Sequence, residues 1–506
     1  MKGNQIKLAA ILSYSTILFN ILAGLIYTPW MVGKIGQSNY GIYTLTISLI
    51  SMFILDFGLS SAVSRFISKY RVENNEQSIN DFLGVTYKLY IYIDILIVIV
   101  LTIVFFMIER IYINLTIDEI HKLKIIYLIS GLFSIISFPF MPLNGIIVAN
   151  EKFIFLKSLD LLQKVLTVLL MCVSLLLGAG LYMLVIVNVG VGIVLIIVKL
   201  VYINKNIKHR VNFKCKNRNI LKQIFSFSIW ATTIGIFQRF ILNITPSILG
   251  VFSGSSQIAI FSIGMTIEGY AYTLSTALSG LFLPKVTNLV YGVSNDSGKK
   301  LESLMIQVGR VQLFIIGAIF SIFITLGKDF VILWMGKGFE NAYIVAILLI
   351  APLVVIVTQE IANTMLVAMN KIKYDAYCIL VTSIISFILS IILTPKMGAI
   401  GAAIAIFIGN IIGRIILKNI FFYKYLEISI RRFYMECQIK MSLPILVTIF
   451  TGIIISYFIP QINMFIFSIK TLFLVLIYTL SMWFIVLNKS EKDLVLNYAI
   501  KFKNKL

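Results

Sequence analysis

Apolar stretches long enough to cross a lipid bilayer follow one another along the whole chain. About 20 apolar residues in a helix cross the roughly 30 Å hydrocarbon core of a membrane. Within hydrocarbon an isolated spanning segment must satisfy its own backbone hydrogen bonds, and a helix does so. The 506 residues are 59% hydrophobic and only 13% charged, whereas about a quarter charged residues is typical of soluble domains. We therefore predict an all-α polytopic membrane protein.

The apolar pattern predicts about fourteen transmembrane helices joined by short loops. The longest loop runs from about 204 to 221, so no segment is expected to fold as a separate soluble domain. The predicted spans are 8–32, 42–64, 82–108, 124–149, 157–178, 181–203, 221–252, 257–284, 301–327, 342–369, 374–395, 399–423, 441–459 and 466–488.

The distribution of Lys and Arg predicts the orientation of these spans. If the N-terminus is cytoplasmic, about 28 of the 43 basic residues fall in cytoplasmic segments and about seven in outer ones. This bias follows the positive-inside rule, and one missed span would destroy it. Both termini are therefore predicted to be cytoplasmic. The same rule accounts for the net charge of +22, so we expect a membrane and no nucleic-acid partner.

An internal repeat indicates two similar halves. Two short motifs of the first half recur about 217 to 219 residues later, a distance in sequence that corresponds to six predicted spans. Because six is an even number, both halves have the same orientation, as in transporters with parallel repeats around a site at the repeat interface. Proline interrupts helical hydrogen bonding, so Pro29 and Pro246 are predicted hinges near the outer helix ends. Two motifs recur at nearly one offset, Thr28-Pro29-x-x-x-Gly33 as Thr245-Pro246-x-x-x-Gly250 and Asn144-x-x-x-Val148-Ala149 as Asn363-x-x-x-Val367-Ala368.

The predicted domain organisation follows from the repeat. Residues 1–203 form a first lobe of six helices and 222–423 a second lobe, joined by a basic cytoplasmic linker at 204–221. Residues 424–506 add two helices and a cytoplasmic tail. The stretch from Lys205 to Lys222 holds seven positive charges and no acid. Two interpretations are open for it: binding of anionic lipid headgroups, or a topology determinant between the lobes.

Ionisable residues at mid-depth in the predicted spans are the candidate site residues. Each one is costly in a membrane unless it is paired or hydrated, so it marks a functional site by default. Guanidinium groups stay charged and bind phosphate in bidentate fashion, which predicts an anionic, phosphate-bearing substrate. The acids would balance the cations or bind a coupling proton or sodium ion. The cations are Lys88, Arg239, Arg310 and Arg414, and the acids are Asp56, Asp94, Glu268 and Glu360.

Some of these charges have a structural interpretation beside the functional one. Arg310 and Arg414 could either snorkel to the interface or line a cavity, and both interpretations are open. Asp56 and Glu360 could pair with a cation for a functional or for a structural reason, and both interpretations are open here too. Asp160 and Lys164 are four residues apart and are predicted to form a local ion pair. The lysines nearest the predicted interfaces are predicted to snorkel; these are Lys199, Lys418 and Lys470.

The sequence lacks the usual signatures of catalytic chemistry. It has no Cys/His cluster with metal spacing, no phosphate-binding glycine loop and no nucleophile elbow. We therefore expect no enzyme activity, no metal and no cofactor. An ion gradient or the membrane potential is the expected energy source.

The residues that follow the first copy of the repeat carry a family resemblance. The run from Val32 to Tyr43, followed by Leu55-Asp56-Phe57-Gly58-Leu59 and then Arg65, resembles the start of Wzx-type polysaccharide flippases. These flippases, which move O-antigen or capsule repeat units, belong to the multidrug/oligosaccharidyl-lipid/polysaccharide exporter superfamily. Length, span count and parallel halves match that family along the whole chain.

The resemblance implies both a fold and a function. It implies two six-helix lobes around a cavity that opens alternately to each side of a bacterial plasma membrane. The implied substrate is an undecaprenyl-pyrophosphate-linked oligosaccharide moved to the outer leaflet for surface polysaccharide or lipopolysaccharide synthesis. Membrane lipids and the polysaccharide polymerase machinery would be partners.

On this basis each candidate residue receives a predicted role. The proposed hinges are Pro29 and Pro246. The predicted pyrophosphate-sugar ligands are Arg239, Arg414, Lys88, Arg310 and Arg65. The predicted coupling or gating acids are Asp56, Glu268, Glu360 and Asp94.

Three alternatives remain open. Lipid II flippases carry essential arginines on their first helix, whereas residues 8–32 here carry no charge. Multidrug and toxin exporters usually have twelve spans and acidic cavities. A membrane polysaccharide polymerase or ligase would need a large outer loop with catalytic groups, and the predicted loops here are short.

Overall fold

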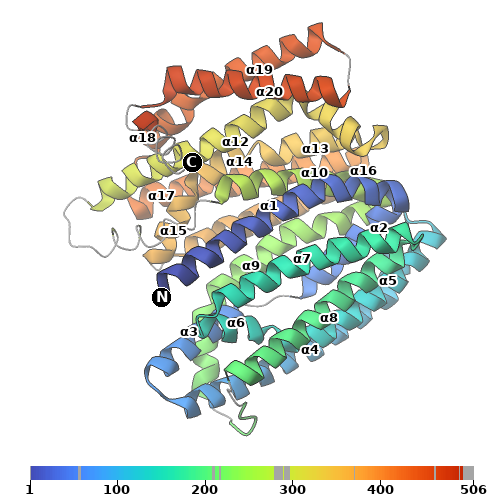
Figure 1. The fold of residues 1–506 in the computed structure, drawn as a ribbon, viewed down its shortest axis with the longest axis vertical. Coiled ribbons are helices and arrows are strands. Elements are labelled where there is room, and N and C mark those ends of the chain that lie inside the picture. Colours follow the sequence, from blue (N-terminus) through green and yellow to red (C-terminus); the bar gives the residue numbers. More distant parts are fainter. Residues whose placement is uncertain are drawn as a thin grey trace. The chain divides into compact units, whose positions relative to one another are not determined.

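The chain is helical throughout the part that its computed structural model describes, and this part contains no strand (Figure 1). The structure describes residues 2–54, 58–207, 211–215, 218–277, 286, 289, 297–369, 371–460, 463–488 and 491–493. Eleven helical segments within these ranges are long and apolar enough to cross a membrane. The protein is therefore a multi-pass membrane protein, as predicted.

The number of spans stays a prediction, because helix boundaries and predicted spans do not coincide everywhere. Helix α16 (Lys373–Gly409) breaks at Gly398, with φ 55° and ψ −133°, which separates the predicted spans 374–395 and 399–423. A Cβ on Gly398 would lie 2.6 Å from Oε1 of Gln257. The same oxygen accepts the Ala399 N–H at 3.0 Å and so satisfies the backbone at the break.

The predicted span 42–64 is wrong as a single helix. Helix α2 (Gln37–Phe53) ends within the predicted span, and a second helix, α3 (Leu59–Val72), begins after Gly58, whose φ is 66°. Residues 55–57 between them lie outside the described part of the chain. Glycine at 58 accommodates this left-handed backbone without the steric cost of a side chain. The continuous apolar sequence therefore did not reveal that one helix ends just before the Asp-Phe-Gly-Leu motif and another begins at its leucine.

The chain packs as two compact units. Unit 1 comprises Met1–Ser262 and Ile379–Gly409, and unit 2 comprises Ile263–Cys378 and Asn410–Leu506. These units reflect packing within the structure. The two predicted lobes, 1–203 and 222–423, remain a prediction from the repeat.

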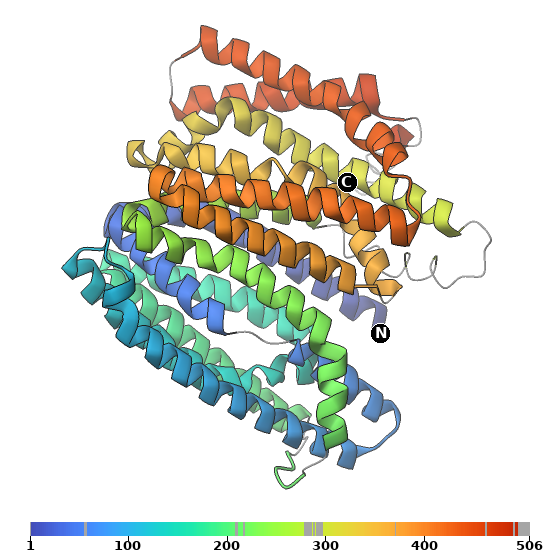
Figure 2. The ribbon, with the colours of Figure 1, turned by 180° about the vertical axis from the view of Figure 1, so that it is seen from behind.

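Unit 1 is a bundle of long helices. Within it α1 packs on α7, α5 packs on α4, and both α5 and α7 pack on α8, an arrangement that Figures 1 and 2 show from opposite sides. Besides α2 and α3, its elements are α1 (Lys2–Ile35), α4 (Glu76–Ile111), α5 (Ile117–Ser137), η1 (Phe138–Phe140), α6 (Pro142–Ala149), α7 (Phe153–Leu176), α8 (Leu181–Asn206), α9 (Arg218–Phe252), the start of α10 (Ser255–Thr276) and α16 from Ile379 onward.

Unit 2 combines long helices with several short or irregular ones. Its longest helix, α12 (Ser297–Met335), packs against α19 (Lys440–Phe458) and α20 (Met464–Ser481). The other elements are η3 (Lys337–Phe339), α13 (Asn341–Ile350), α14 (Leu353–Ile356), η4 (Val357–Gln359), α15 (Glu360–Ala368), the π-helix η5 (Asn410–Leu417), α17 (Lys418–Leu426), α18 (Ile430–Phe433), and the π-helices η6 (Tyr434–Ile439) and η7 (Met482–Val486).

The Thr-Pro repeat corresponds to the same local structure in both copies. Helices α1 and α9 continue through Pro29 and Pro246. Each is followed by a glycine with positive φ, 86° at Gly36 and 83° at Gly254, and then by the next helix, α2 or α10. The repeated unit is therefore helix, glycine turn, helix. That its prolines act as hinges remains a prediction.

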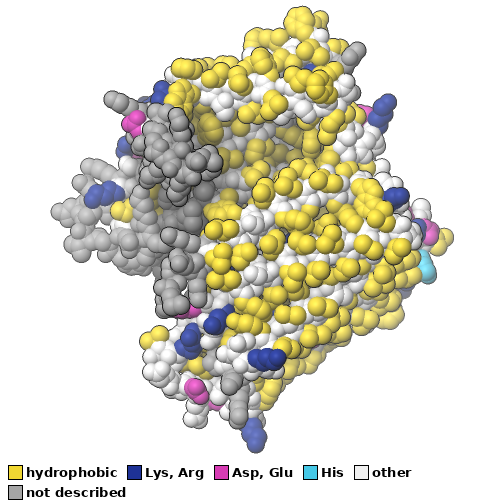
Figure 3. All heavy atoms as spheres, in the orientation of Figure 1, with side chains coloured by type: hydrophobic (Ala, Val, Ile, Leu, Met, Phe, Trp, Pro, Cys, Tyr) yellow, Lys and Arg dark blue, Asp and Glu magenta, His cyan; other side chains and the backbone are white. Residues whose placement is uncertain are grey.

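The surface of the helices fits a lipid environment. Figure 3 shows hydrophobic side chains covering the sides of the unit 1 helices, while charged side chains gather near helix ends. Large apolar side chains such as Leu176, Phe106 and Ile26 are more than 70% exposed. In water such a surface would be an aggregation liability, whereas lipid tails solvate it.

The basic segment 211–215 is anchored to α4. The Asn212 N–H donates to the Asn80 carbonyl at 3.0 Å, and its side-chain amide donates to Asp81 Oδ1 at 2.6 Å. Lys88 Nζ donates to the Cys215 carbonyl at 3.0 Å. A Cβ on Gly84 would lie 1.8 Å from the Asn212 carbonyl oxygen. Docking of this segment therefore requires glycine at position 84.

We predict that Gly84→Val releases this segment from α4, because the valine side chain would occupy the space of the Asn212 carbonyl. Limited trypsin digestion should cleave after Lys214 several-fold faster than in the unsubstituted protein. Gly190→Val on α8 is the matched control, since a Cβ there meets nothing within 4 Å. Equal cleavage rates in the two variants would contradict the anchoring.

Candidate functional site

Unit 2 contains a group of charged side chains that sequence-distant helices bring together. We call Glu268, Glu360, Asp375, Arg414 and Lys418 the polar cluster; they come from α10, α15, α16, η5 and α17. Tyr272, one helical turn beyond Glu268 on α10, interacts electrostatically with the three acids and with Arg414. The cluster therefore combines three carboxylates with two cations among apolar helices, where such groups mark functional sites.

Arg414 is the cation of the cluster with donor capacity left over. Its Nε is buried and has no hydrogen-bond partner among the described residues, while Glu268 interacts with it electrostatically. It lies in the π-helix η5, Asn410–Leu417, and π-helical turns occur frequently at functional sites. A guanidinium with a buried unpaired N–H has a donor available for an anionic ligand.

Lys418 is the second cation, and the prediction that it snorkels is wrong. Its Nζ lies 2.6 Å from Asp375 Oδ1, and the two side chains are only 4% and 16% exposed. Because Asp375 supplies a counter-charge inside the protein, the ammonium need not reach the interface. Sequence reasoning missed Asp375 because it lies at the predicted end of a span, where a charged residue is expected to be solvated.

Glu360 occupies the first residue of α15, and the Asn363 amide holds it in place. Glu360 Oε2 accepts the Asn363 side-chain N–H at 3.1 Å, and Asn363 Oδ1 is buried without a partner in the described part of the chain. Next to it, Gln359 Nε2 donates to Asn419 Oδ1 at 2.8 Å. These amides orient the cluster and leave acceptors for a ligand or an ion.

At the positions that the predicted repeat makes equivalent, the first half of the chain lacks most of these charges. At an offset of 219, Glu360, Asp375 and Arg414 correspond to Met141, Leu156 and Leu195. Only the lysine and the asparagine persist, and in the first copy Lys199 Nζ donates to Asn144 Oδ1 at 2.9 Å. If the predicted repeat holds, the polar cluster is specific to its second half.

Arg239 caps the end of a helix in unit 1. One guanidinium nitrogen donates to the carbonyls of Ser51 at 3.1 Å and Ile54 at 2.9 Å, at the C-terminal end of α2. A cation there interacts favourably with the helix dipole. Asp56, two residues beyond Ile54, lies outside the described residues. Arg239 thus reaches the edge of the motif that carries the family resemblance.

The other predicted site residues lie elsewhere in the two units. Lys88 holds the basic segment, as described above. Arg65 is exposed on α3. Asp94 lies on α4, with Oδ1 buried and unpartnered within the described ranges. Asp160 pairs with Lys157 at 3.1 Å, three residues earlier, so its predicted pairing with Lys164 is wrong.

Arg310 is fully engaged within unit 2. Its Nε and one terminal nitrogen donate to the Glu491 carboxylate at 2.6 and 2.8 Å, and the remaining bonds go to the Glu436 and Val486 carbonyls. Burial alone would raise the pKa of Glu491, but hydrogen bonds from Arg310 and the Asn488 N–H bring it below its ordinary value. This geometry makes Arg310 a structural tie between α12 and the chain's end.

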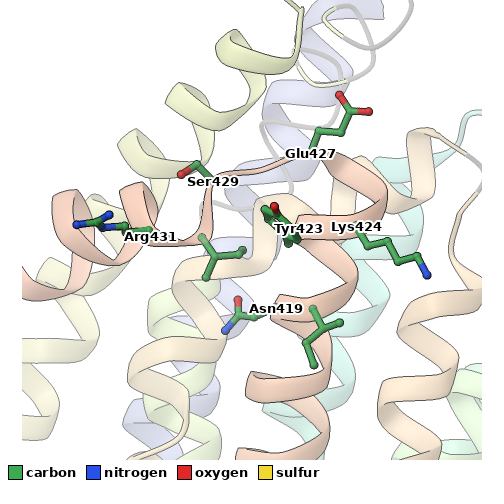
Figure 4. A pocket seen from close by; sticks show the side chains of 8 residues that line it. Asn419, Tyr423, Lys424, Glu427, Ser429 and Arg431 are labelled. Atoms are coloured by element: carbon green, nitrogen blue, oxygen red, sulfur yellow. The ribbon is translucent and has the colours of Figure 1, made fainter.

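A cavity of about 800 Å³ opens where α17 turns into α18 (Figure 4). Asn419 forms part of its wall and links it to Gln359, the neighbour of Glu360 in the polar cluster. Figure 4 shows Lys424 and Arg431 on opposite sides of Tyr423, and Glu427 also borders the space. The two cations diverge and an acid lies near them, so we place the candidate site at the polar cluster instead.

Comparison with solved structures shows which known fold this protein shares. The structure is similar to the lipid II flippase MurJ in an inward closed conformation, with a TM-score of 0.74 and 16% identity over 96% of this chain and 99% of that one. It is also similar to an inward-facing multidrug resistance MATE family transporter of the MOP superfamily, with a TM-score of 0.67 and 15% identity over 83% and 99%. The fold is therefore MurJ/MATE-like.

Comparison of sequences shows the family. Residues 7–293 match the family described as "Polysaccharide biosynthesis protein", which is more than half of the chain. The chain belongs to this family, consistent with the predicted resemblance to polysaccharide flippases. It is 26% identical over 212 residues to the capsular polysaccharide biosynthesis protein CapF of Staphylococcus aureus. That alignment covers 41% of this chain and 52% of CapF, about half of each.

We predict that Asp375→Asn destabilises the protein by about 3–5 kcal/mol, because it leaves the buried Lys418 ammonium without its counter-charge. Replacing both members, as Asp375→Leu with Lys418→Met, should restore most of the stability. Thermal unfolding of the purified protein in detergent measures both effects. Glu73→Gln is the control, since its pair with Lys69 is about half exposed or more and such pairs contribute about 0–1 kcal/mol. Similar melting temperatures for Asp375→Asn and this control would contradict the pairing.

Proposed function

We propose that this protein moves undecaprenyl-pyrophosphate-linked oligosaccharide repeat units from the inner to the outer leaflet of a bacterial plasma membrane. Membership of the polysaccharide biosynthesis family and the MurJ/MATE-like fold support a transporter of lipid-linked glycans. The observation that carries the proposal is the Arg414 guanidinium, whose buried Nε lacks a partner among the described residues. A pyrophosphate crossing a membrane needs such a cation.

Transport requires that the cluster be stable without substrate and that it bind the pyrophosphate, and the residues of the polar cluster can meet both requirements. Without substrate, the acids around Arg414 reduce the cost of a cation among apolar helices. A pyrophosphate that binds Arg414 competes with these acids, and protonation or a bound cation at Glu268 or Glu360 would relieve the repulsion. In this proposal Glu268 and Glu360 couple transport to an ion gradient, and Asp375 keeps Lys418 in position.

Residues of unit 1 have proposed supporting roles. Arg239 and the exposed Arg65 are proposed to contact the pyrophosphate-sugar on its way to the cluster, and Asp94 is a further proposed coupling group. Lys88, and Arg310 of unit 2, are left out as ligands because the Lys88 ammonium binds a carbonyl and all three Arg310 guanidinium nitrogens bind carbonyl or carboxylate oxygens. Arg239 is kept because its two bonds to carbonyls come from a single guanidinium nitrogen. Pro29 and Pro246 are proposed hinges for opening the halves alternately, with both termini in the cytoplasm.

We predict that Arg414→Gln lowers the transport rate roughly 10- to 100-fold, because a hydrogen bond to a charged group contributes about 1.5–3 kcal/mol. Arg414→Lys should retain part of the activity, since it keeps the charge but loses the bidentate geometry. Proteoliposomes that contain a fluorescent undecaprenyl-pyrophosphate oligosaccharide, assayed by accessibility of the glycan to an external lectin, measure this rate.

The matched control is Arg431→Gln, which removes an exposed guanidinium of unit 2 in α18, outside the polar cluster. It should transport at the unsubstituted rate. Normal transport by Arg414→Gln would overturn the assignment of Arg414. Joining of oligosaccharides by the purified protein, without their transfer between leaflets, would favour a polymerase instead.

A further inference from the structure

Three helices begin around one carboxylate in unit 1. Glu119 Oε1 accepts hydrogen bonds from the hydroxyls of Ser38 and Ser255, each at 2.5 Å. Its Oε2 accepts the Thr116 N–H at 2.9 Å. Ser38 lies in the first turn of α2, Ser255 is the first residue of α10, and Glu119 itself lies in the first turn of α5. We call Ser38, Thr116, Glu119 and Ser255 the Glu119 node.

Electrostatics explains why an acid holds this position. Each helix N-terminus carries a partial positive charge of roughly half a unit. The starts of α2 and α10 approach so closely that the Ser38 and Ser255 hydroxyl oxygens are 3.2 Å apart. Without the Glu119 charge these like partial charges would repel each other. The carboxylate therefore holds together three helix ends that would otherwise separate.

The node joins the two copies of the Thr-Pro repeat. Ser38 follows the glycine turn of the first copy and Ser255 follows that of the second. A Cβ on Gly41 would lie 2.0 Å from the Ser255 carbonyl oxygen, so α2 meets α10 backbone to backbone. Beside it, Asn114 Nδ2 donates to the Val251 carbonyl at 2.5 Å. The turn between α4 and α5 thus clamps both copies.

Helix α10 connects the node to the polar cluster. It begins in unit 1 at Ser255 and continues into unit 2, where it carries Glu268. At 1.5 Å per residue, the two residues are about 20 Å apart along one helix. A helix transmits displacement of one end to the other. Separation of α10 from α2 at the node would therefore shift Glu268 relative to its neighbours, including Arg414.

We propose that the Glu119 node is a latch that keeps this end of the two repeats closed, and that its release accompanies a change at the polar cluster. The latch rests on the proposed transport function, and Glu119 acts as a positioning residue that does not contact the substrate. By the distribution of Lys and Arg, the latched end faces the outside of the cell. Transport would require the node to break and re-form in each cycle.

Accessibility of a buried position tests the latch without any substrate. Ser247 on α9 is 8% exposed, so Ser247→Cys, in a protein whose four native cysteines are replaced, should react slowly with a membrane-impermeant maleimide. Adding Glu119→Gln should increase the labelling rate at least several-fold. Glu109→Gln is the matched control, because Glu109 lies in the last turn of α4, outside the Glu119 node, and pairs with Lys124.

A second variant opens the node without changing charge. Gly41→Val should force α2 away from the Ser255 carbonyl and raise the labelling rate as Glu119→Gln does. Circular dichroism and size-exclusion profiles establish that each variant is folded. Labelling rates of Glu119→Gln and Gly41→Val that equal those of the control would overturn the latch.

A reversible cross-link tests whether the latch must open. Because the two hydroxyl oxygens are 3.2 Å apart, Ser38→Cys with Ser255→Cys should form a disulfide on oxidation. We expect oxidised protein to lose transport and reduced protein to regain it. Unchanged transport by fully cross-linked protein would overturn the latch and leave the proposed function intact. Absence of glycan transfer by the unsubstituted protein would instead overturn the function, while the maleimide experiment still decides the latch.

Discussion

Every charge that this chain places between its apolar helices needs a partner inside the protein, and the structure depends on how those partners are found. Lipid offers no hydrogen bonds, so an unpaired buried charge is very costly. The chain meets this constraint with pairs that join distant segments, such as Lys418 with Asp375 and Arg310 with Glu491. Arg414 stands out because part of its guanidinium is left unpaired within the described residues.

The two copies of the Thr-Pro repeat combine one local backbone structure with different side chains. Both copies keep the helix, glycine turn and helix, because the turn needs a backbone with positive φ at Gly36 and Gly254. Side chains that point between helices are free to differ as long as their charges are balanced. The second copy carries Glu360 and Arg414 where the first carries Met141 and Leu195. Shared fold and divergent chemistry are thus compatible within one chain.

Sequence reasoning identified part of the candidate site. Arg414, Glu268 and Glu360 stand out because charges are rare in apolar spans, and the structure brings these three together with Asp375 and Lys418. Depth along a span says nothing about rotation around the helix axis, so the sequence could not separate Arg414 from the fully engaged Arg310. The π-helix at Asn410–Leu417 shifts that rotation further. Glu119 was missed because its sequence position places it at the predicted edge of a span.

The sequence by itself determined the class of fold, the membrane setting and the repeated Thr-Pro motif. The first two follow from hydrophobicity and from the distribution of Lys and Arg, and the third recurs together with a second motif at nearly the same distance in sequence. All of these are properties of the order of residues along the chain. Only the tertiary structure decided where the helices break, which charges pair, and that Ser38 and Ser255 share Glu119. Such pairings join residues up to 217 positions apart, and packing of whole helices brings them together.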